Sequence, residues 1–89
     1  MLTDELQKTI NRAFDEAIER RHEYLTLEHL LHALTHERTA SRVVKNCGGD
    51  VDRLRRDLER YFEDRLETLP VGDTRTPEQT QAFQRVIQR

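Results

Sequence analysis

Apolar side chains recur every three or four residues in several separate stretches of this chain. The first stretch has the clearest pattern. Its apolar residues are Leu6, Ile10, Ala13, Phe14, Ala17 and Ile18. This spacing is typical of an amphipathic helix that buries one face. Thr3 is a suitable N-cap, and Asp4 and Glu5 place negative charge in the first turn, where the helix dipole favours anions. Because such helices must bury their apolar faces against one another, we predict an all-α fold.

A second and a third helix are predicted after a connector at residues 20–25. Thr26 is the expected N-cap of the second helix, with Glu28 in its first turn. Its apolar stripe consists of Leu27, Leu30, Leu31 and Leu34. The third helix is expected to start at Thr39 or Ser41 and to carry Ala40, Val43, Val44 and Cys47. Gly48-Gly49 then ends it, since glycine readily supplies a left-handed C-cap.

A fourth helix is predicted after Asp50, which is a good N-cap. Its apolar face is formed by Val51, Leu54, Leu58, Tyr61 or Phe62, and Leu66. The periodicity is lost from Glu67 to Arg75, where proline and glycine indicate a loop. Thr76-Pro77 has the residue types of a new helix start, and we expect that helix to continue to Arg89.

Two short stretches of the chain resemble each other at an offset of 77 residues. Leu6–Arg12 and Phe83–Arg89 share glutamine, isoleucine and arginine at equivalent places, and three other positions are chemically close. The offset matches the length of the predicted four-helix unit, which indicates an internal duplication. We therefore expect a four-helix repeat at 1–66, a loop at 67–75 and the start of a second repeat at 76–89. On this interpretation the chain is a fragment of a two-repeat domain.

The charge pattern argues against nucleic-acid and membrane partners. Fifteen basic and 17 acidic residues are interleaved, giving a net charge of −2 and no basic stripe that could follow a phosphate backbone. No apolar run approaches the ~18 residues of a membrane span, and the first residues do not resemble a signal peptide. Cys47 is the only cysteine, so no internal disulfide can form. We expect a cytoplasmic protein.

The histidines raise the question of a metal site or a catalytic site. His29, His32 and His36 fall near one face of the second helix, and His32 and His36 have a spacing that can share a zinc ion. No cysteine or carboxylate clearly completes such a site, so we interpret these histidines as a solvated polar face opposite the leucine stripe. Cys47 is expected to be a small buried hydrophobe and not a nucleophile. We predict no catalytic residue, no metal and no cofactor.

Several motifs are similar to those of a known family. The run from His22 to Leu34 contains a Thr-x-Glu-His-Leu-Leu core followed by Ala-Leu, which resembles the first repeat of Clp ATPase N-terminal domains. Asn11-x-Ala13-Phe14 and Phe83–Arg89 resemble the same family, and the His-Glu-aromatic lead-in is most similar to its ClpA branch. The resemblance implies a pseudo-duplicated domain of two four-helix repeats. It also implies a domain tethered to ATPase modules, and the phosphate-binding Gly-x-x-x-x-Gly-Lys motif of such modules does not occur here.

The resemblance also implies partners and a binding face. In the ClpA branch this domain binds the ClpS adaptor and recruits protein substrates, which the full-length ATPase delivers to the ClpP peptidase. The adaptor-facing positions correspond to Glu23, Glu28, Thr80 and Arg85. In the related ClpC branch, the glutamate equivalent to Glu28 helps to bind phosphorylated arginine.

Other interpretations of the sequence are a free-standing helical protein-interaction module, a helix-turn-helix nucleic-acid binder and a histidine-based metal hydrolase. The charge balance disfavours the nucleic-acid binder, and the incomplete ligand set disfavours the hydrolase. The expected function is therefore non-catalytic recruitment of adaptors and substrates.

Overall fold

The computed structural model describes residues 3–88, and within this range it contains five helices and one short pair of strands. In chain order the elements are α1 (Asp4–Glu19), β1 (Tyr24–Leu25), α2 (Leu27–Leu34), α3 (Arg38–Asn46), α4 (Val51–Arg65), β2 (Glu78–Gln79) and α5 (Gln81–Ile87). The predicted all-α fold is confirmed. None of the helices described is both long and apolar enough to span a lipid bilayer. Arg89, where the last helix was expected to continue, lies outside the described residues.

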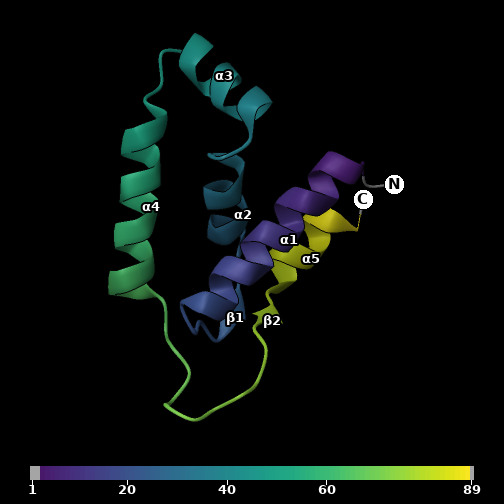
Figure 1. Cartoon of the computed structure of the whole chain (residues 1–89), viewed down its shortest axis with the longest axis vertical. Coiled ribbons are helices and arrows are strands. Elements are labelled where there is room, and N and C mark those ends of the chain that lie inside the picture. Colours follow the sequence, from purple (N-terminus) through teal and green to yellow (C-terminus); the bar gives the residue numbers. More distant parts are fainter. Residues whose placement is uncertain (1–2, 89) are drawn as a thin grey trace.

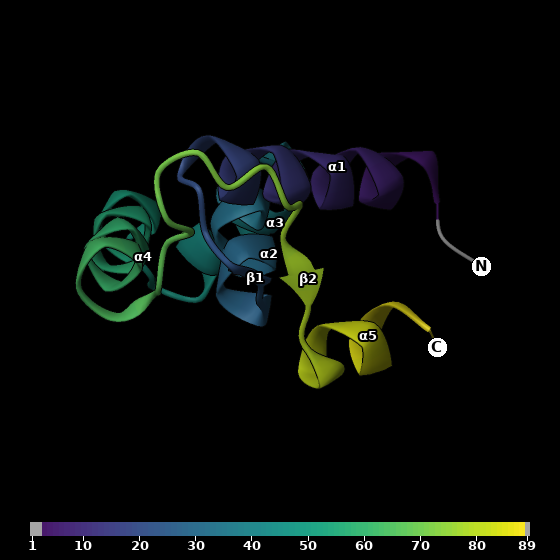
Figure 2. The ribbon, with the colours of Figure 1, turned by 90° about the horizontal axis from the view of Figure 1, so that it is seen from below.

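The helices are arranged around α2. Figure 1 shows α4 on one side of α2 and α5 on the other. In the view from below, α1 lies above α2 and α5, and β2 lies beside β1 on the side of α5 (Figure 2). Because α1 packs most closely against α2, these two helices form the main helix–helix interface.

The first helix begins and packs largely as predicted. Thr3 Oγ1 accepts a hydrogen bond from the Leu6 backbone N–H at 3.1 Å, which makes Thr3 the N-cap of α1. Ala13 and Ala17 are fully buried on the face toward α2. Ile18, which was predicted to share that face, is 44% exposed instead. The reason is geometric, since each helical residue is turned by about 100° from the one before it and Ile18 is thereby turned away from the Ala17 side.

The third helix starts earlier than predicted. The carboxylate of Glu37 accepts a hydrogen bond from the Ala40 backbone N–H at 2.7 Å, so the N-cap is Glu37 and neither Thr39 nor Ser41. The Glu37 side chain accepts from one of the backbone N–H groups that have no partner within the first turn, although glutamate is not a preferred cap residue. The helix consequently begins at Arg38.

The end of α3 has the predicted glycine cap. Gly48 has a φ of 85°, its N–H donates to the Lys45 carbonyl, and the N–H of Gly49 donates to the Val44 carbonyl at 2.9 Å. These two bonds form a Schellman motif, which needs a left-handed residue at the position of Gly48. Cys47 was predicted to be buried, but it is exposed because it lies at the C-cap, where the helix ends.

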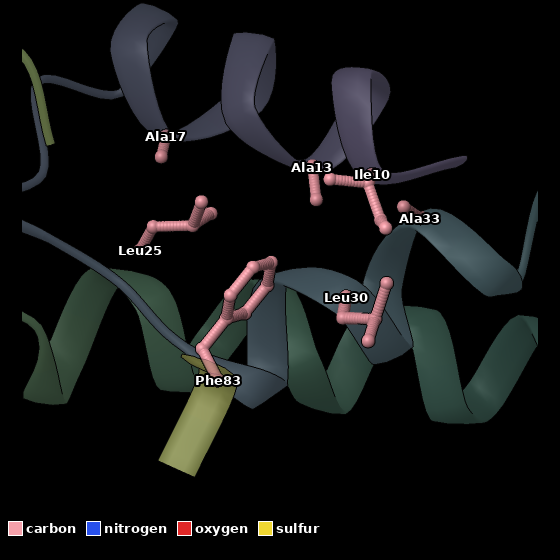
Figure 3. Packing of buried hydrophobic residues seen from close by; sticks show 7 residues of the cluster. All are labelled: Ile10, Ala13, Ala17, Leu25, Leu30, Ala33 and Phe83. Atoms are coloured by element: carbon pink, nitrogen blue, oxygen red, sulfur yellow. The ribbon is translucent and has the colours of Figure 1, made fainter. Parts of the chain in front are cut away.

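The apolar core lies between α1, α2 and α5. Its buried members are Ile10, Ala13, Ala17, Leu25, Leu30, Ala33 and Phe83. Figure 3 shows the ring of Phe83 pointing from α5 into the space between α1 and α2. The alanines of α1 allow this close approach, since they leave room for the ring. A residue from the end of the chain therefore completes the core that α1 and α2 begin.

The segment after α4 differs most from the prediction. Thr76-Pro77 was expected to start a helix, but Glu78–Gln79 forms strand β2 and α5 begins only at Gln81. The N–H of Glu78 donates to the Glu23 carbonyl and that of Thr80 to the Leu25 carbonyl, at 3.0 and 3.1 Å. These backbone bonds require an extended conformation, which overrides the local helix signal of a threonine followed by proline.

The corrected start of α5 extends the internal similarity. Thr3 and Thr80 are 77 residues apart, the same offset that relates Leu6 to Phe83. Both threonines are N-caps, and their hydroxyl groups accept hydrogen bonds from the N–H groups of Leu6 and Phe83, respectively. The two stretches thus share a cap as well as an apolar pattern.

Candidate functional site

The two short strands bring distant parts of the chain together. β1 and β2 are parallel, with Tyr24 opposite Glu78 and Leu25 opposite Gln79. Each strand is followed by a threonine and then by a helix, so α2 and α5 begin at the same end of the strand pair. Three of the four residues predicted to face a partner, Glu23, Glu28 and Thr80, consequently lie within three residues of this pair.

Glu23 lies directly before β1 in a fixed backbone conformation. Its N–H donates to the Glu67 carbonyl at 3.1 Å, and its carbonyl accepts from the N–H of Glu78 at 3.0 Å. Glu23 and Glu78 also line one shallow cleft together with Arg75. Arg75 donates a hydrogen bond from Nε to the Asp73 carboxylate. This bond and the charge of Asp73 raise the pKa of Arg75, and the charge of Glu23 adds to the effect. The side chain of Glu23 is half-buried, so a partner can reach its carboxylate.

Glu28 is the second residue of α2, where the helix dipole favours a negative charge. Its side chain is also half-buried. In the described residues its carboxylate has neither a hydrogen bond nor an ion pair. The position of Glu28 is thus compatible with a favourable interaction with the helix dipole and also with a contact to a partner.

Thr80 and Arg85 belong to α5. The hydroxyl oxygen of Thr80 accepts a hydrogen bond from the Phe83 N–H at 3.2 Å, so this side chain has a structural role as the N-cap. Arg85 is exposed in the last turn of α5 and has no carboxylate within 4.0 Å among the described residues. The structure thus places Thr80 beside the strand pair and Arg85 further along the helix.

A buried pair of histidines lies beneath β1. His29 Nε2 is 2.7 Å from His22 Nδ1, and His29 Nδ1 accepts a hydrogen bond from the Thr26 backbone N–H at 2.9 Å. Because that Nδ1 is an acceptor, a neutral His29 carries its proton on Nε2 and donates it to His22. The ring of Phe62 stacks on His29 with centroids 4.8 Å apart. This arrangement fixes the connector before β1 against α2 and α4.

The prediction of a solvated histidine face is wrong for His29 and His32. Both side chains are buried, whereas His36 is exposed. The reason is that α4 covers this side of α2 and Phe62 packs against all three of His22, His29 and His32. Leu31, which was predicted to be part of the buried stripe, is 41% exposed. In the sequence, the only indication of this contact was that Phe62 is one of two candidates for the apolar face of the fourth helix.

Burial lowers the pKa of both members of the histidine pair. Desolvation is the main cause, and it lowers the pKa of His29 to about 4, with repulsion from His22 and His32 adding to the effect. Desolvation and the charge of Arg20 lower the pKa of His22. Both rings are therefore neutral at pH 7, as the tautomer assignment requires.

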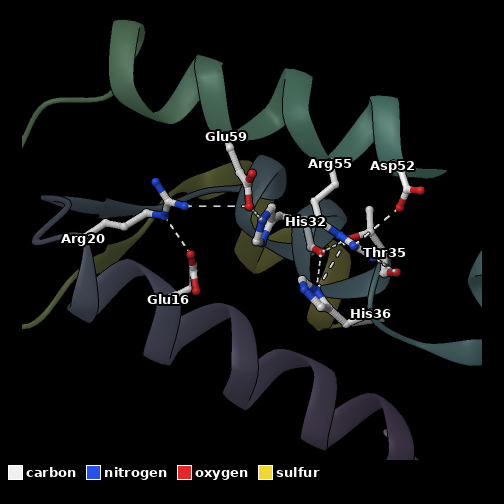
Figure 4. Close-up of polar contacts among 8 residues, drawn as sticks. All are labelled: Glu16, Arg20, His32, Thr35, His36, Asp52, Arg55 and Glu59. Carbon is white, nitrogen blue, oxygen red and sulfur yellow. Dashed lines mark hydrogen bonds and ion pairs between the residues drawn. The ribbon is translucent and has the colours of Figure 1, made fainter. Parts of the chain in front are cut away.

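A second polar network joins α1, α2 and α4. Figure 4 shows Arg20 between Glu16 and Glu59, and His32 beside Glu59. Arg20 Nε donates to Glu16 at 2.7 Å, and His32 Nε2 lies 3.1 Å from Glu59. Burial raises the pKa of Glu16, but the hydrogen bond and charge of Arg20 outweigh it, so that the pKa lies below its ordinary value. The Arg20 guanidinium also lies over the Phe62 ring, 5.2 Å from its centroid.

The accessible side chains near the strand pair are mainly polar and charged. No group of three or more histidine, cysteine, aspartate or glutamate side chains between residues 3 and 88 is placed to hold a metal ion. Phe62 covers His22 and His29, and the hydrogen bonds of these histidines hold the connector before β1 in place. What remains accessible near the strand pair is a set of half-buried or exposed charged side chains, which suits a polar protein interface.

Comparison with known proteins identifies a family and a relative of this chain. The sequence model of the Clp repeat (R) N-terminal domain matches residues 1–89. A protein named "ClpA homolog protein" from Fuscovulum blasticum is 46% identical over 87 residues. That match covers 94% of this chain and 11% of the relative, so the chain spans about a tenth of the length of the relative.

Proposed function

Because the chain belongs to the Clp repeat N-terminal domain family, we propose that it docks a ClpS-type adaptor and protein substrates for a ClpA-like unfolding ATPase. Clp N-terminal domains are non-catalytic domains of Clp ATPases. The proposed role is to raise the concentration of substrate near the ATPase, since a tethered capture site makes delivery effectively intramolecular. The ATPase would then pass unfolded substrates to a ClpP peptidase, and the proposed location is the cytoplasm.

The observation that supports this proposal most directly is the parallel pairing of β1 and β2. It holds residues from both predicted repeats, Glu23 and Glu28 in one and Thr80 in the other, at one end of two neighbouring helices. Two backbone hydrogen bonds, from Glu78 to Glu23 and from Thr80 to Leu25, fix the two segments relative to each other. A partner that contacts both predicted repeats would therefore meet contact residues at fixed positions. Mixed charges with few buried apolar groups suit a transient complex, which must release what it captures.

Calorimetric titration of the protein with a ClpS-type adaptor tests the proposal. We expect the Glu23→Ala/Glu28→Ala variant to bind at least about tenfold more weakly, equivalent to ~1.4 kcal/mol. The matched control is Glu63→Ala/Asp64→Ala, which removes the same charge from exposed positions at the end of α4 and should leave affinity unchanged. Circular dichroism checks that all variants are folded.

The other outcomes assign the function differently. Equal weakening in both double variants would mean that net charge, and not this surface, governs binding. Unchanged affinity in the Glu23→Ala/Glu28→Ala variant would place the adaptor elsewhere on the domain. A folded wild-type protein that does not bind the adaptor would favour direct capture of substrates.

A further inference from the structure

The third helix stands apart from the rest of the fold. Of the five helices between residues 3 and 88, α3 is the one without a buried side chain. Its sequence is nevertheless amphipathic, with Val43 and Val44 on one side and basic residues on the other. Val43 is 57% exposed. An amphipathic helix with an apolar face that the domain leaves open is a candidate docking surface.

The apolar side of α3 borders a groove that it shares with α2 and α4. Figure 1 shows α3 across the neighbouring ends of these two helices. The apolar residues of the groove include Leu31, Leu34, Val43, Val44, Val51 and Leu54. The two hydroxyl groups in its lining are already bonded, since Thr35 donates to the His32 carbonyl and Ser41 to the Thr35 carbonyl. The groove therefore offers a partner almost only apolar contacts.

The basic side of α3 borders a second hollow, between α3 and the start of α4. Arg38, Arg42 and Lys45 line it from α3 at helical spacing, and Arg55 lines it from α4. Like charges one turn apart, as in Arg38 and Arg42, disfavour the helix that carries them. A cluster of this kind is stabilised when a partner supplies the opposite charge.

The negative groups nearby are already engaged. Asp50 accepts the Arg53 N–H as the N-cap of α4, and Asp52 lies 3.7 Å from Arg55. Arg38, Arg42 and Lys45 have no carboxylate within 4.0 Å in the part of the chain that the structure describes. Three cations are therefore left uncompensated on a protein whose net charge is −2.

The two hollows adjoin, because Ser41 and Val51 line both of them. We propose that α3, with the adjoining ends of α2 and α4, forms a second docking surface for acidic peptide segments that carry an aliphatic or aromatic residue. The apolar side chain occupies the groove, and the carboxylates of the same peptide meet Arg38, Arg42 and Lys45. This surface includes none of Glu23, Glu28, Thr80 and Arg85, so it does not depend on the function proposed above.

A peptide fits these features better than a nucleic acid or a membrane does. Single-stranded nucleic acids stack their bases on aromatic side chains, and neither hollow is lined by an aromatic residue. A membrane-surface helix needs a long apolar face with lysine and arginine beside it, whereas α3 has nine residues and its apolar side closes into a groove with α2 and α4. The combination of one apolar groove and three adjacent cations matches a short acidic segment with an apolar anchor.

Fluorescence anisotropy with a labelled hexapeptide, DELFDE, tests the proposal. Two control peptides separate the contributions, one with lysines in place of the acidic residues and one with serines in place of Leu-Phe. We expect DELFDE to bind and both controls to bind at least about fivefold more weakly. Arg42→Glu/Lys45→Glu should weaken DELFDE binding by roughly tenfold, and Val43→Ser by roughly threefold. Arg56→Glu/Arg60→Glu, which makes the same charge change at exposed positions outside both hollows, should have less than about a twofold effect.

Circular dichroism of each variant confirms that α3 is folded before affinities are compared. Equal binding of the lysine peptide would overturn the proposal, as would equal losses in the Arg42→Glu/Lys45→Glu and Arg56→Glu/Arg60→Glu variants. Binding of a DNA duplex or of phosphatidylserine vesicles that is lost in Arg42→Glu/Lys45→Glu, without binding of DELFDE, would assign the surface to phosphate and overturn it also.

Discussion

His22 and His29 form a direct ring-to-ring hydrogen bond, with His22 Nδ1 and His29 Nε2 2.7 Å apart in the interior of the domain. Since the Thr26 N–H occupies the other nitrogen of His29, both rings must be neutral for this chain of hydrogen bonds to exist. His22 precedes β1 and His29 lies in the first turn of α2. The pair therefore links the stability of the domain to the position of the strand that carries the candidate site.

The first prediction concerns pH. The pKa of His29 falls from about 6.5 for a free histidine to about 4, so the unfolded chain takes up this proton at a higher pH than the folded chain does. The contribution of His29 to stability is therefore complete above about pH 6.5 and is lost progressively as the pH falls toward about 4. We expect the loss to reach roughly 3 kcal/mol. Urea unfolding at a series of pH values measures it.

A variant comparison separates this effect from the titration of carboxylates. His29→Gln keeps a neutral acceptor for the Thr26 N–H but cannot be protonated in this range, so its stability should change much less between pH 6.5 and 4. His36→Gln is the comparison variant. Burial and the charge of Arg55 also lower the pKa of His36, but this residue is exposed whereas His29 is fully buried, so we expect His36→Gln to reduce the slope less than His29→Gln does. A His29→Gln protein with the same slope as the wild type would contradict the assignment to His29.

The second prediction concerns two neighbouring aromatic residues of α4. Phe62 is 1% exposed and contacts the rings of His22, His29 and His32, whereas Tyr61 is 38% exposed. Phe62→Ala should lower the free energy of unfolding by about 3–5 kcal/mol, since it removes a buried ring and leaves a cavity beside polar groups. Tyr61→Ala should cost less than about 1 kcal/mol. Thermal unfolding followed by circular dichroism ranks the two, and equal losses would show that Phe62 is not the anchor of α4.

The helices and their caps could be predicted from the sequence because they depend on local features. Thr3, Asp50 and Gly48 act through neighbours three or four residues away, so their roles follow from the pattern of nearby residues. The fold class follows from the same periodicity. The sequence did not distinguish Tyr61 from Phe62 as the buried residue of the fourth helix. The packing of α4 shows that it is Phe62.

The strand pair and the buried histidines could not be predicted in this way, because they depend on contacts between distant segments. Thr76-Pro77 has a local signal for a helix start, but pairing with residues 23–25 holds this segment extended. His29 and His32 lie opposite the leucine stripe, and only the arrival of α4 buries them. The candidate site at Glu23, Glu28, Thr80 and Arg85 came from family resemblance, and its role in binding stays a prediction.

The third prediction separates the structural role of Thr80 from its proposed role in docking. Thr80→Ala removes the acceptor for the Phe83 N–H and should destabilise the domain by about 1 kcal/mol. Thr80→Ser keeps that acceptor and should be nearly neutral in stability. If Thr80 also contacts the adaptor through its methyl group, Thr80→Ser should weaken binding without lowering the melting temperature. Equal stability of the alanine and serine variants would show that the cap contributes nothing.

The last prediction concerns the connection between the core and the candidate site. Phe83 is fully buried between α1 and α2, whereas Val86 on the same helix is 50% exposed. Phe83→Ala should therefore loosen α5 and the strand before it, and Val86→Ala should not. The N–H groups of Glu78 and Thr80, which donate to the carbonyls of Glu23 and Leu25, report this loosening directly. Hydrogen exchange at these two amides should become at least about tenfold faster in Phe83→Ala, because a cavity of this kind costs several kcal/mol and local opening becomes easier. Unchanged exchange at Glu78 and Thr80, beside a lower global stability, would mean that the strand pair is held by its own hydrogen bonds and not by the ring of Phe83.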